Sequence, residues 1–241
     1  MISFSNFNRK RIQNSFSVLF VLFLVGGCRP DNREVTVDFQ LIQNGTPYGI
    51  STPFYNGDTA IAIDLFHFYV SNLRAGNELL SDVLFVDPSD SSFSSYKLDL
   101  QRRADQISFG LGVPADMNAM DPTSFETTHP LSSAFAMYWT WASKYRFLKA
   151  EGRFNAGGDL SNAATNGGII WHTGTDPLYR TRTFDVSVRP GDRLVVRIDL
   201  NRLLGNVSLA NDGFTHTTVD TYATAEKVSN EAIAAIEVVV E

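Results

Sequence analysis

The chain has 241 residues, of which 44% are hydrophobic and 19% charged, so it is neither a disordered nor a collagen-like protein. The formal net charge is −6, and removing the three positive charges of residues 9–11 leaves −9 for everything after residue 27. A body this acidic repels phosphate backbones, which argues against nucleic acid as a partner. The single cysteine excludes an intrachain disulfide and a cysteine-rich metal site.

Residues 1–27 have the parts of a bacterial secretory signal. Basic residues at 9–11 precede an apolar run at 16–25, and Gly26-Gly27 leads into Cys28. The run is about ten residues long, too short to span a bilayer as a helix. Small residues directly before the cysteine resemble a lipobox, so we expect cleavage and lipidation at Cys28. An ordinary signal peptide with an incidental cysteine is the alternative. The lipobox predicts an exported lipoprotein at the periplasmic face or cell surface of the outer membrane.

The mature chain reads as a short polar tether at 28–34 followed by one domain at 35–241. Apolar and polar residues alternate from Val35 to Leu41, and Asn44-Gly45 ends that strand in a turn. A long apolar strand is expected from Ala60 to Val70. Shorter strands are expected at 83–86, 95–100, 106–111, 145–151, 168–173, 183–188, 193–199 and 236–240.

Helical signals are confined to the C-terminal third of the chain. In residues 222–235, apolar side chains at Ala225, Val228 and Ala232 recur with helical spacing, and residues 199–205 predict a single helical turn. Many short strands separated by turns predict an all-β fold, an antiparallel β-sandwich of Greek-key type with one late short helix.

Residues 137–152, MYWTWASKYRFLKAEG, contain five aromatic side chains, and as a strand they would place Trp139 and Trp141 on one face. Four other segments carry further distinctive residues. These are IDLFHFYVSNL at 63–73, ISFGLGV at 107–113, His129-Pro130-Leu131, and Trp171-His172-Thr173-Gly174. In their order and spacing, the segments resemble the MbnP-like family of secreted copper-binding proteins.

The resemblance implies a β-rich exported protein that binds copper through histidines and a kynurenine. In the family, a partner dihaem peroxidase forms the kynurenine from tryptophan, and a TonB-type receptor is a further expected partner. The chain has no G-x-S-x-G, phosphate-loop or H-E-x-x-H motif, so we expect no enzyme. Two functions stay open. One is a lipid-anchored copper-binding protein in copper capture or handling, and the other is a metal-free structural or accessory lipoprotein of the cell envelope.

The four histidines are the candidate metal ligands, because imidazole suits copper. His172 ends an apolar strand and is the first choice, with His129, in a loop before Pro130, as its partner. His216, in a polar loop before the late helix, or His67, in the long apolar strand, would complete the site. For each, a packed or solvated structural histidine is the alternative. Unlike some relatives, the chain has no His-x-His pair.

Two tryptophans are candidates for oxidation to kynurenine. Trp139 is the first choice because it belongs to the Met-Tyr-Trp element, and Trp171 is the second because it precedes His172. The alternative for both is burial in the core, where an aromatic side chain contributes several kcal/mol. Nothing in the sequence attaches haem, so the oxidant has to come from another protein.

Overall fold

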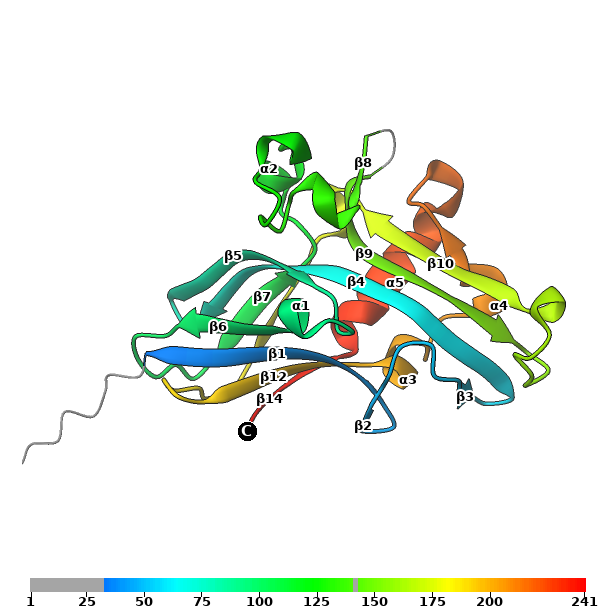
Figure 1. Ribbon diagram of the computed structural model, residues 1–241, viewed down its shortest axis with the longest axis horizontal. Coiled ribbons are helices and arrows are strands. Elements are labelled where there is room, and N and C mark those ends of the chain that lie inside the picture. Colours follow the sequence, from blue (N-terminus) through cyan, green and yellow to red (C-terminus); the bar gives the residue numbers. More distant parts are fainter. Residues whose placement is uncertain (1–32, 141–142) are drawn as a thin grey trace, which may run out of the picture. The chain divides into compact units, whose positions relative to one another are not determined.

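The structure is a computed structural model that describes residues 33–140 and 143–241 (Figure 1). The expected signal at 1–27, the lipidation site Cys28 and all but the last two residues of the expected tether lie outside the described residues. Within the described part of the chain, strands dominate and form two sheets, with short helices between them.

The first sheet has the strand order β14-β12-β1-β2, with β6 also paired to β1. Its central strand β1 forms where the sequence alternates, and every second side chain from Val35 to Leu41 is buried in the core. The turn after β1 is formed by Asn44 and Gly45, both with positive φ. The strands are β1 (Glu34–Gln43), β2 (Thr46–Pro47), β6 (Ser95–Asp99), β12 (Arg193–Asp199) and β14 (Ile236–Val240).

The second sheet has the order β11-β7-β4-β9-β10-β13, with β3 and β5 also paired to β4, and β8 paired to β9. The long strand β4 lies beside β9 with a register shift between Ile63 and Leu65. Gly152 permits this contact, because a Cβ there would lie 2.3 Å from the carbonyl oxygen of Ala62. The strands are β3 (Phe54–Asn56), β4 (Thr59–Ala75), β5 (Glu78–Val86), β7 (Ile107–Leu111), β8 (Tyr138–Trp139), β9 (Lys144–Asn155), β10 (Gly167–Gly174), β11 (Arg180–Phe184) and β13 (Phe214–Thr215).

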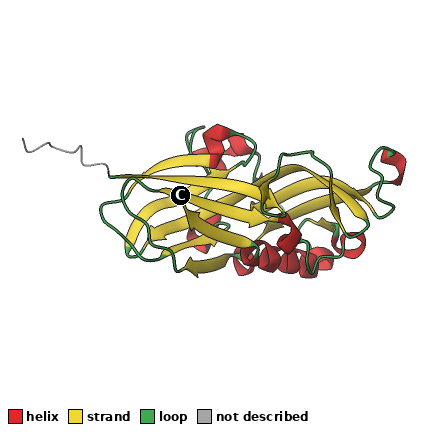
Figure 2. Ribbon diagram, turned by 90° about the horizontal axis from the view of Figure 1, so that it is seen from below, coloured by secondary structure: helices red, strands yellow, loops and turns green. Residues whose placement is uncertain are grey.

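The helices are short except for α5, which packs against β10 and β11 and lies along one face of the strands (Figure 2). The α-helices are α1 (Ser91–Ser94), α2 (Ala115–Asn118), α3 (Leu200–Leu203), α4 (Leu209–Asp212) and α5 (Tyr222–Ala234). Single 3-10 turns occur at Pro122–Ser124, Ser133–Phe135, Ala163–Thr165, Asp176–Leu178 and Val219–Thr221. None of the helices in the described residues has the length and apolar character needed to cross a bilayer.

The main hydrophobic core combines side chains of both sheets with the inner face of α5. Phe39 of β1, Phe68 of β4, Trp171 of β10 and Val228 of α5 all belong to this cluster. A second, smaller cluster under the 113–137 loops is built on Tyr69, Phe85, Tyr145 and Phe147, with Leu131 of the loops packed into it. The second sheet is therefore covered on both faces over part of its length.

The expected β-rich fold and the late helix are confirmed, but the expectation of purely antiparallel sheets is wrong. β1 runs parallel to β12, and β10 runs parallel to β13. Alternating burial reads the same in either chain direction, so it cannot set the direction of pairing. The strand expected at 183–188 ends at Phe184 and begins earlier, at Arg180. The sandwich architecture and its Greek-key connectivity stay predictions.

Candidate functional site

Three aromatic rings from distant parts of the chain meet on one face of the second sheet. The rings of His172 and His216 are stacked, with centroids 4.8 Å apart and planes 9° from parallel. The Trp139 ring meets both edge to face, with its centroid 5.3 Å from that of His172 and 4.6 Å from that of His216. We call these three residues the ring cluster.

The pairing of β10 with β13 explains why the two histidines are neighbours. The strands are parallel, and Trp171 lies opposite Thr215 at the end of the pairing. One residue further along each chain are His172 and His216. The turn after β13 is fixed by hydrogen bonds, since Thr217 donates its backbone N–H to Thr215 Oγ1 at 3.0 Å and its hydroxyl to the carbonyl oxygen of His172 at 2.8 Å.

Trp139 reaches the cluster on a hairpin formed by β8 and the start of β9, in which it lies opposite Lys144. The hairpin approaches the end of β10 closely at Gly174. A Cβ there would lie 2.4 Å from Cβ of Ser143, so only glycine leaves room for the loop. The strand expected at 145–151 is part of β9, and residues 138–139 pair back onto its start as β8. Trp141 lies outside the described residues. His172 and Gly174 stand two residues apart on β10. His172 supplies a ring of the cluster, and Gly174 leaves room for the β8–β9 hairpin.

A buried cation stands beside the ring cluster. The Arg146 side chain is mostly buried, its Cζ lies 4.6 Å from the Trp139 ring centroid, and its Nη2 donates to the carbonyl oxygen of Ala136 at 2.6 Å. This is a cation–π contact at a partly desolvated position. Burial lowers the pKa of Arg146, but an arginine stays protonated in proteins. Its charge also disfavours protonation of His172 and His216.

His172 is neutral at neutral pH. Burial lowers its pKa from 6.5 to about 4; a hydrogen bond with Glu151 opposes that shift, while Arg146 and His216 add to it. Nε2 of His172 lies 2.9 Å from Oε1 of Glu151, and Nζ of Lys149 lies 3.4 Å from the same oxygen. Burial also lowers the pKa of His216. The cluster therefore presents two unprotonated imidazoles at neutral pH.

The donors of the ring cluster fit copper in their chemistry. Nδ1 of His172 is buried and has no hydrogen-bond partner among the described residues, which leaves one ring nitrogen available. Unprotonated imidazole is the form that binds a metal, and it suits copper. In the part of the chain that the structure describes, no three or more His, Cys, Asp or Glu side chains are gathered as a metal-binding group. The cluster thus supplies two imidazole donors and the Trp139 ring beside them.

Trp171, the second candidate for oxidation, lies on the opposite face of β10 from His172, because neighbouring residues of a strand point to opposite faces. It is fully buried in the main core, and its Nε1–H donates to the carbonyl oxygen of Asp212 at 2.7 Å. The structure therefore places Trp139 in the ring cluster and Trp171 in the core.

The other two candidate histidines have separate surroundings. The ring of His129 stacks on Phe125, with centroids 4.1 Å apart, and its Nδ1 accepts from the backbone N–H of Leu131. Nε2 of His67 lies 3.1 Å from Oδ2 of Asp87. β9 lies between β4, which carries His67, and β10, which carries His172. The two histidines are therefore on strands that are not paired with each other. The structure gives His172 a different neighbour, His216, from the expected partner His129.

Sequence reasoning missed three charged residues around the cluster. Lys149 and Glu151 stand two apart in a predicted strand, so their shared face could have been read from the alternation. The hydrogen bond between Glu151 and His172 depends on the pairing of β9 with β10, for which the sequence carries no signal. The position of Arg146 over Trp139 depends in the same way on the β8–β9 hairpin.

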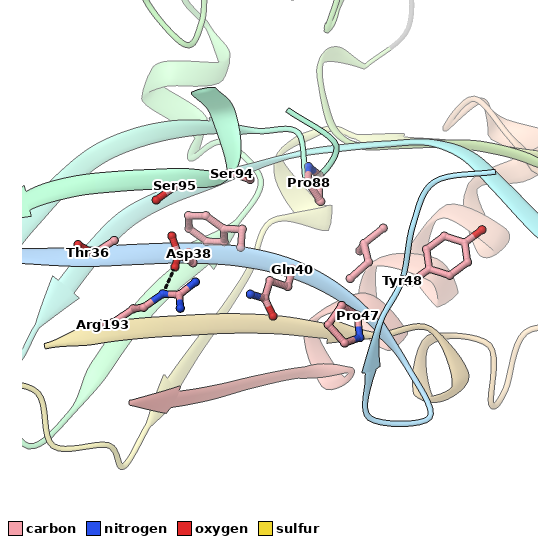
Figure 3. Close-up of a pocket in the computed structure, with 11 residues that line it drawn as sticks. Thr36, Asp38, Gln40, Pro47, Tyr48, Pro88, Ser94, Ser95 and Arg193 are labelled. Atoms are coloured by element: carbon pink, nitrogen blue, oxygen red, sulfur yellow. Dashed lines mark hydrogen bonds and ion pairs between the residues drawn. The ribbon is translucent and has the colours of Figure 1, made fainter. Parts of the chain in front are cut away.

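A pocket of about 480 Å³ lies elsewhere, along β1 (Figure 3). Asp38 and Arg193 form an ion pair at this pocket. Its described lining contains no histidine or tryptophan, so we do not assign the site there. It is lined by Thr36, Asp38, Phe39, Gln40, Leu41, Pro47, Tyr48, Pro88, Ser94, Ser95 and Arg193.

Comparisons with known proteins agree with the resemblance drawn from the sequence. Among solved structures, MbnP from Methylosinus trichosporium matches with a TM-score of 0.52 and 16% identity, over 73% of this chain and 78% of that chain. At this identity the likeness shows a shared fold. A search of curated proteins found no match. The profile of the MbnP family matches residues 32–221, well over half of the chain. The protein therefore belongs to the MbnP family.

Proposed function

We propose that this protein is an exported, lipid-anchored copper-binding protein that acts in copper capture or handling. His172 and His216 supply imidazole ligands, and Trp139 is the residue converted to kynurenine. The lipid anchor is Cys28, and the protein is placed at the outer membrane, on its periplasmic face or at the cell surface. This location rests on the sequence of the first 28 residues.

The observation that carries the proposal is the convergence of His172, His216 and Trp139 from three segments of the chain. The imidazole of His172 is buried, which costs free energy, and a structural role would ordinarily satisfy its ring nitrogens. Instead Nδ1 of His172 is buried without a partner in the described residues, as is Nδ1 of His67, but the His172 ring is also stacked on a second imidazole. A site kept neutral and partly desolvated is suited to accept a metal ion.

Membership of the MbnP family supports the same assignment for Trp139. Its ring lies against both histidines, so a modified side chain at this position would reach the same metal. A kynurenine supplies carbonyl and amine donors that the indole of tryptophan lacks. Forming it needs an external oxidant, and a dihaem peroxidase is the proposed partner; a TonB-type receptor is the proposed partner in uptake.

One observation favours the alternative, a metal-free accessory lipoprotein of the cell envelope. The guanidinium of Arg146, whose Cζ is 4.6 Å from the Trp139 ring centroid, repels a cation bound at the ring cluster. Glu151, in contact with His172, offsets that charge. The net charge of these two groups sets how strongly the cluster attracts copper.

The proposal is tested on the protein purified from its native host, where the oxidising partner is present. We expect copper to co-purify in an amount close to one ion per chain, and peptide mass analysis to locate the modification at Trp139. Trp171 provides the internal control, since its indole is buried in the core and should remain unmodified. Copper-free protein with all tryptophans intact would support the accessory lipoprotein instead.

A further inference from the structure

A carboxylate outside the three rings contacts the ring cluster. Glu151 of β9 lies with its Oε1 2.9 Å from Nε2 of His172 on the neighbouring strand β10. Lys149, two residues earlier on the same face, places its Nζ 3.4 Å from that oxygen. A glutamate side chain beside a lysine ammonium is ionised at neutral pH.

This contact fixes where the proton of His172 resides. A neutral imidazole has one N–H donor and one acceptor nitrogen, whereas an ionised carboxylate can only accept. The 2.9 Å contact is a hydrogen bond only if Nε2 carries the proton. Nδ1 then keeps its lone pair, and it is the atom that is buried without a partner in the described residues.

We propose that Glu151 is a positioning residue that holds His172 in the Nε2–H form and leaves Nδ1 as the nitrogen that ligates copper. The proposal rests on the proposed function of His172. A carboxylate that accepts from the second nitrogen of a ligand histidine fixes the ring orientation and raises the basicity of the ligating nitrogen. Both residues lie on paired strands of one sheet, so the orientation is built into the scaffold.

The first test needs no metal. Nitrogen NMR of the full-length protein with labelled histidines reports which ring nitrogen is protonated, and the signal of His172 is assigned from its loss in His172→Gln. We expect the Nε2–H form in the wild type. Glu151→Ala should give a mixture of both tautomers, whereas Glu151→Gln, which keeps a side-chain acceptor oxygen, should retain the Nε2–H form.

The second test measures Cu(I) affinity without oxygen, against a competing chelator. Loss of such a partner typically weakens metal binding about 10–100-fold, which we expect for Glu151→Ala, with a smaller loss for Glu151→Gln. Glu237→Ala is the matched control. Its carboxylate has the same 39% side-chain exposure and pairs with Arg197, but it stands on β14 of the other sheet. This control should bind Cu(I) as the wild type does.

The nitrogen signals also identify the ligating atom, because Cu(I) is diamagnetic. On binding, the Nδ1 signal of His172 should shift, while Nε2 remains protonated. An Nδ1–H form in the wild type, a Cu(I)-induced shift at Nε2, or unchanged tautomer and affinity in Glu151→Ala would each overturn the proposal. If the wild type binds no Cu(I), the proposed function fails, and the tautomer of His172 in Glu151→Ala alone decides the positioning role.

Discussion

Lowering the pH is expected to destabilise the folded protein through His172. In the unfolded chain this histidine has its ordinary pKa of 6.5, whereas in the folded protein burial lowers the pKa to about 4. Between these two values the unfolded state binds a proton that the folded state does not. Stability from this group is therefore fully present above pH 6.5 and is lost progressively as the pH falls toward about 4.

The size of the effect follows from the difference between the two pKa values. A difference of about 2.5 in pKa corresponds to about 3 kcal/mol at most, because each pKa unit is worth about 1.4 kcal/mol. The side chain is only 7% exposed, so screening by solvent removes little of it. Since domains are stable by about 5–15 kcal/mol, the loss is a large fraction of the total.

The assay is urea unfolding of the metal-free full-length protein at a series of pH values, compared with His172→Gln. The difference in unfolding free energy between the two proteins should shrink by about 3 kcal/mol from pH 7 to pH 4. His129→Gln is the control, because its ring is less buried and its contribution should be smaller. A difference between wild type and His172→Gln that stays constant over this range would refute the neutral, buried state of His172.

Three further predictions follow from single contacts. Trp171→Phe removes a buried indole that donates to the carbonyl oxygen of Asp212, and should cost about 2–4 kcal/mol in thermal or urea unfolding. Gly174→Ala places a methyl group 2.4 Å from Cβ of Ser143, and should lower stability by about 1–3 kcal/mol and perturb tryptophan fluorescence; an unchanged variant would show that the hairpin is loosely held. Cys28→Ser should move the protein out of the outer-membrane fraction; fractionation identical to the wild type would contradict lipid anchoring.

Strand positions could be predicted wherever one face of the strand is buried. The alternation from Val35 to Leu41 locates β1, and the apolar run from Ala60 to Val70 locates the centre of β4. The direction of pairing could not be predicted, because the parallel neighbours β1 and β12 are distant in sequence and their alternation has no polarity. The predicted strand at 183–188 lies too far toward the C-terminus. β11 ends at Phe184, and the apolar residues after it belong to a loop.

The candidate site was predictable only in part. Trp139 and His172 lie in segments with distinctive composition, and the resemblance of these segments to the MbnP-like family indicated both residues as site candidates. His216 follows a strand of two residues, too short to show any periodicity, and only its parallel pairing with β10 brings it to His172. Arg146 and Glu151 are ordinary charged positions of a predicted strand, and nothing in the sequence around them indicates a site. Their contacts with the ring cluster arise from strand register, which a single sequence does not encode locally.

The central claim, a copper site on His172 and His216, is tested most directly by Cu(I) affinities of four alanine variants of the full-length protein, measured without oxygen. The account predicts that His172→Ala and His216→Ala each weaken binding by about 100-fold, equivalent to about 2.7 kcal/mol. His129→Ala and His67→Ala, whose rings contact Phe125 and Asp87 instead, should bind as the wild type does. Unchanged affinity in His216→Ala, or a loss in His129→Ala as large as that in His172→Ala, would contradict it.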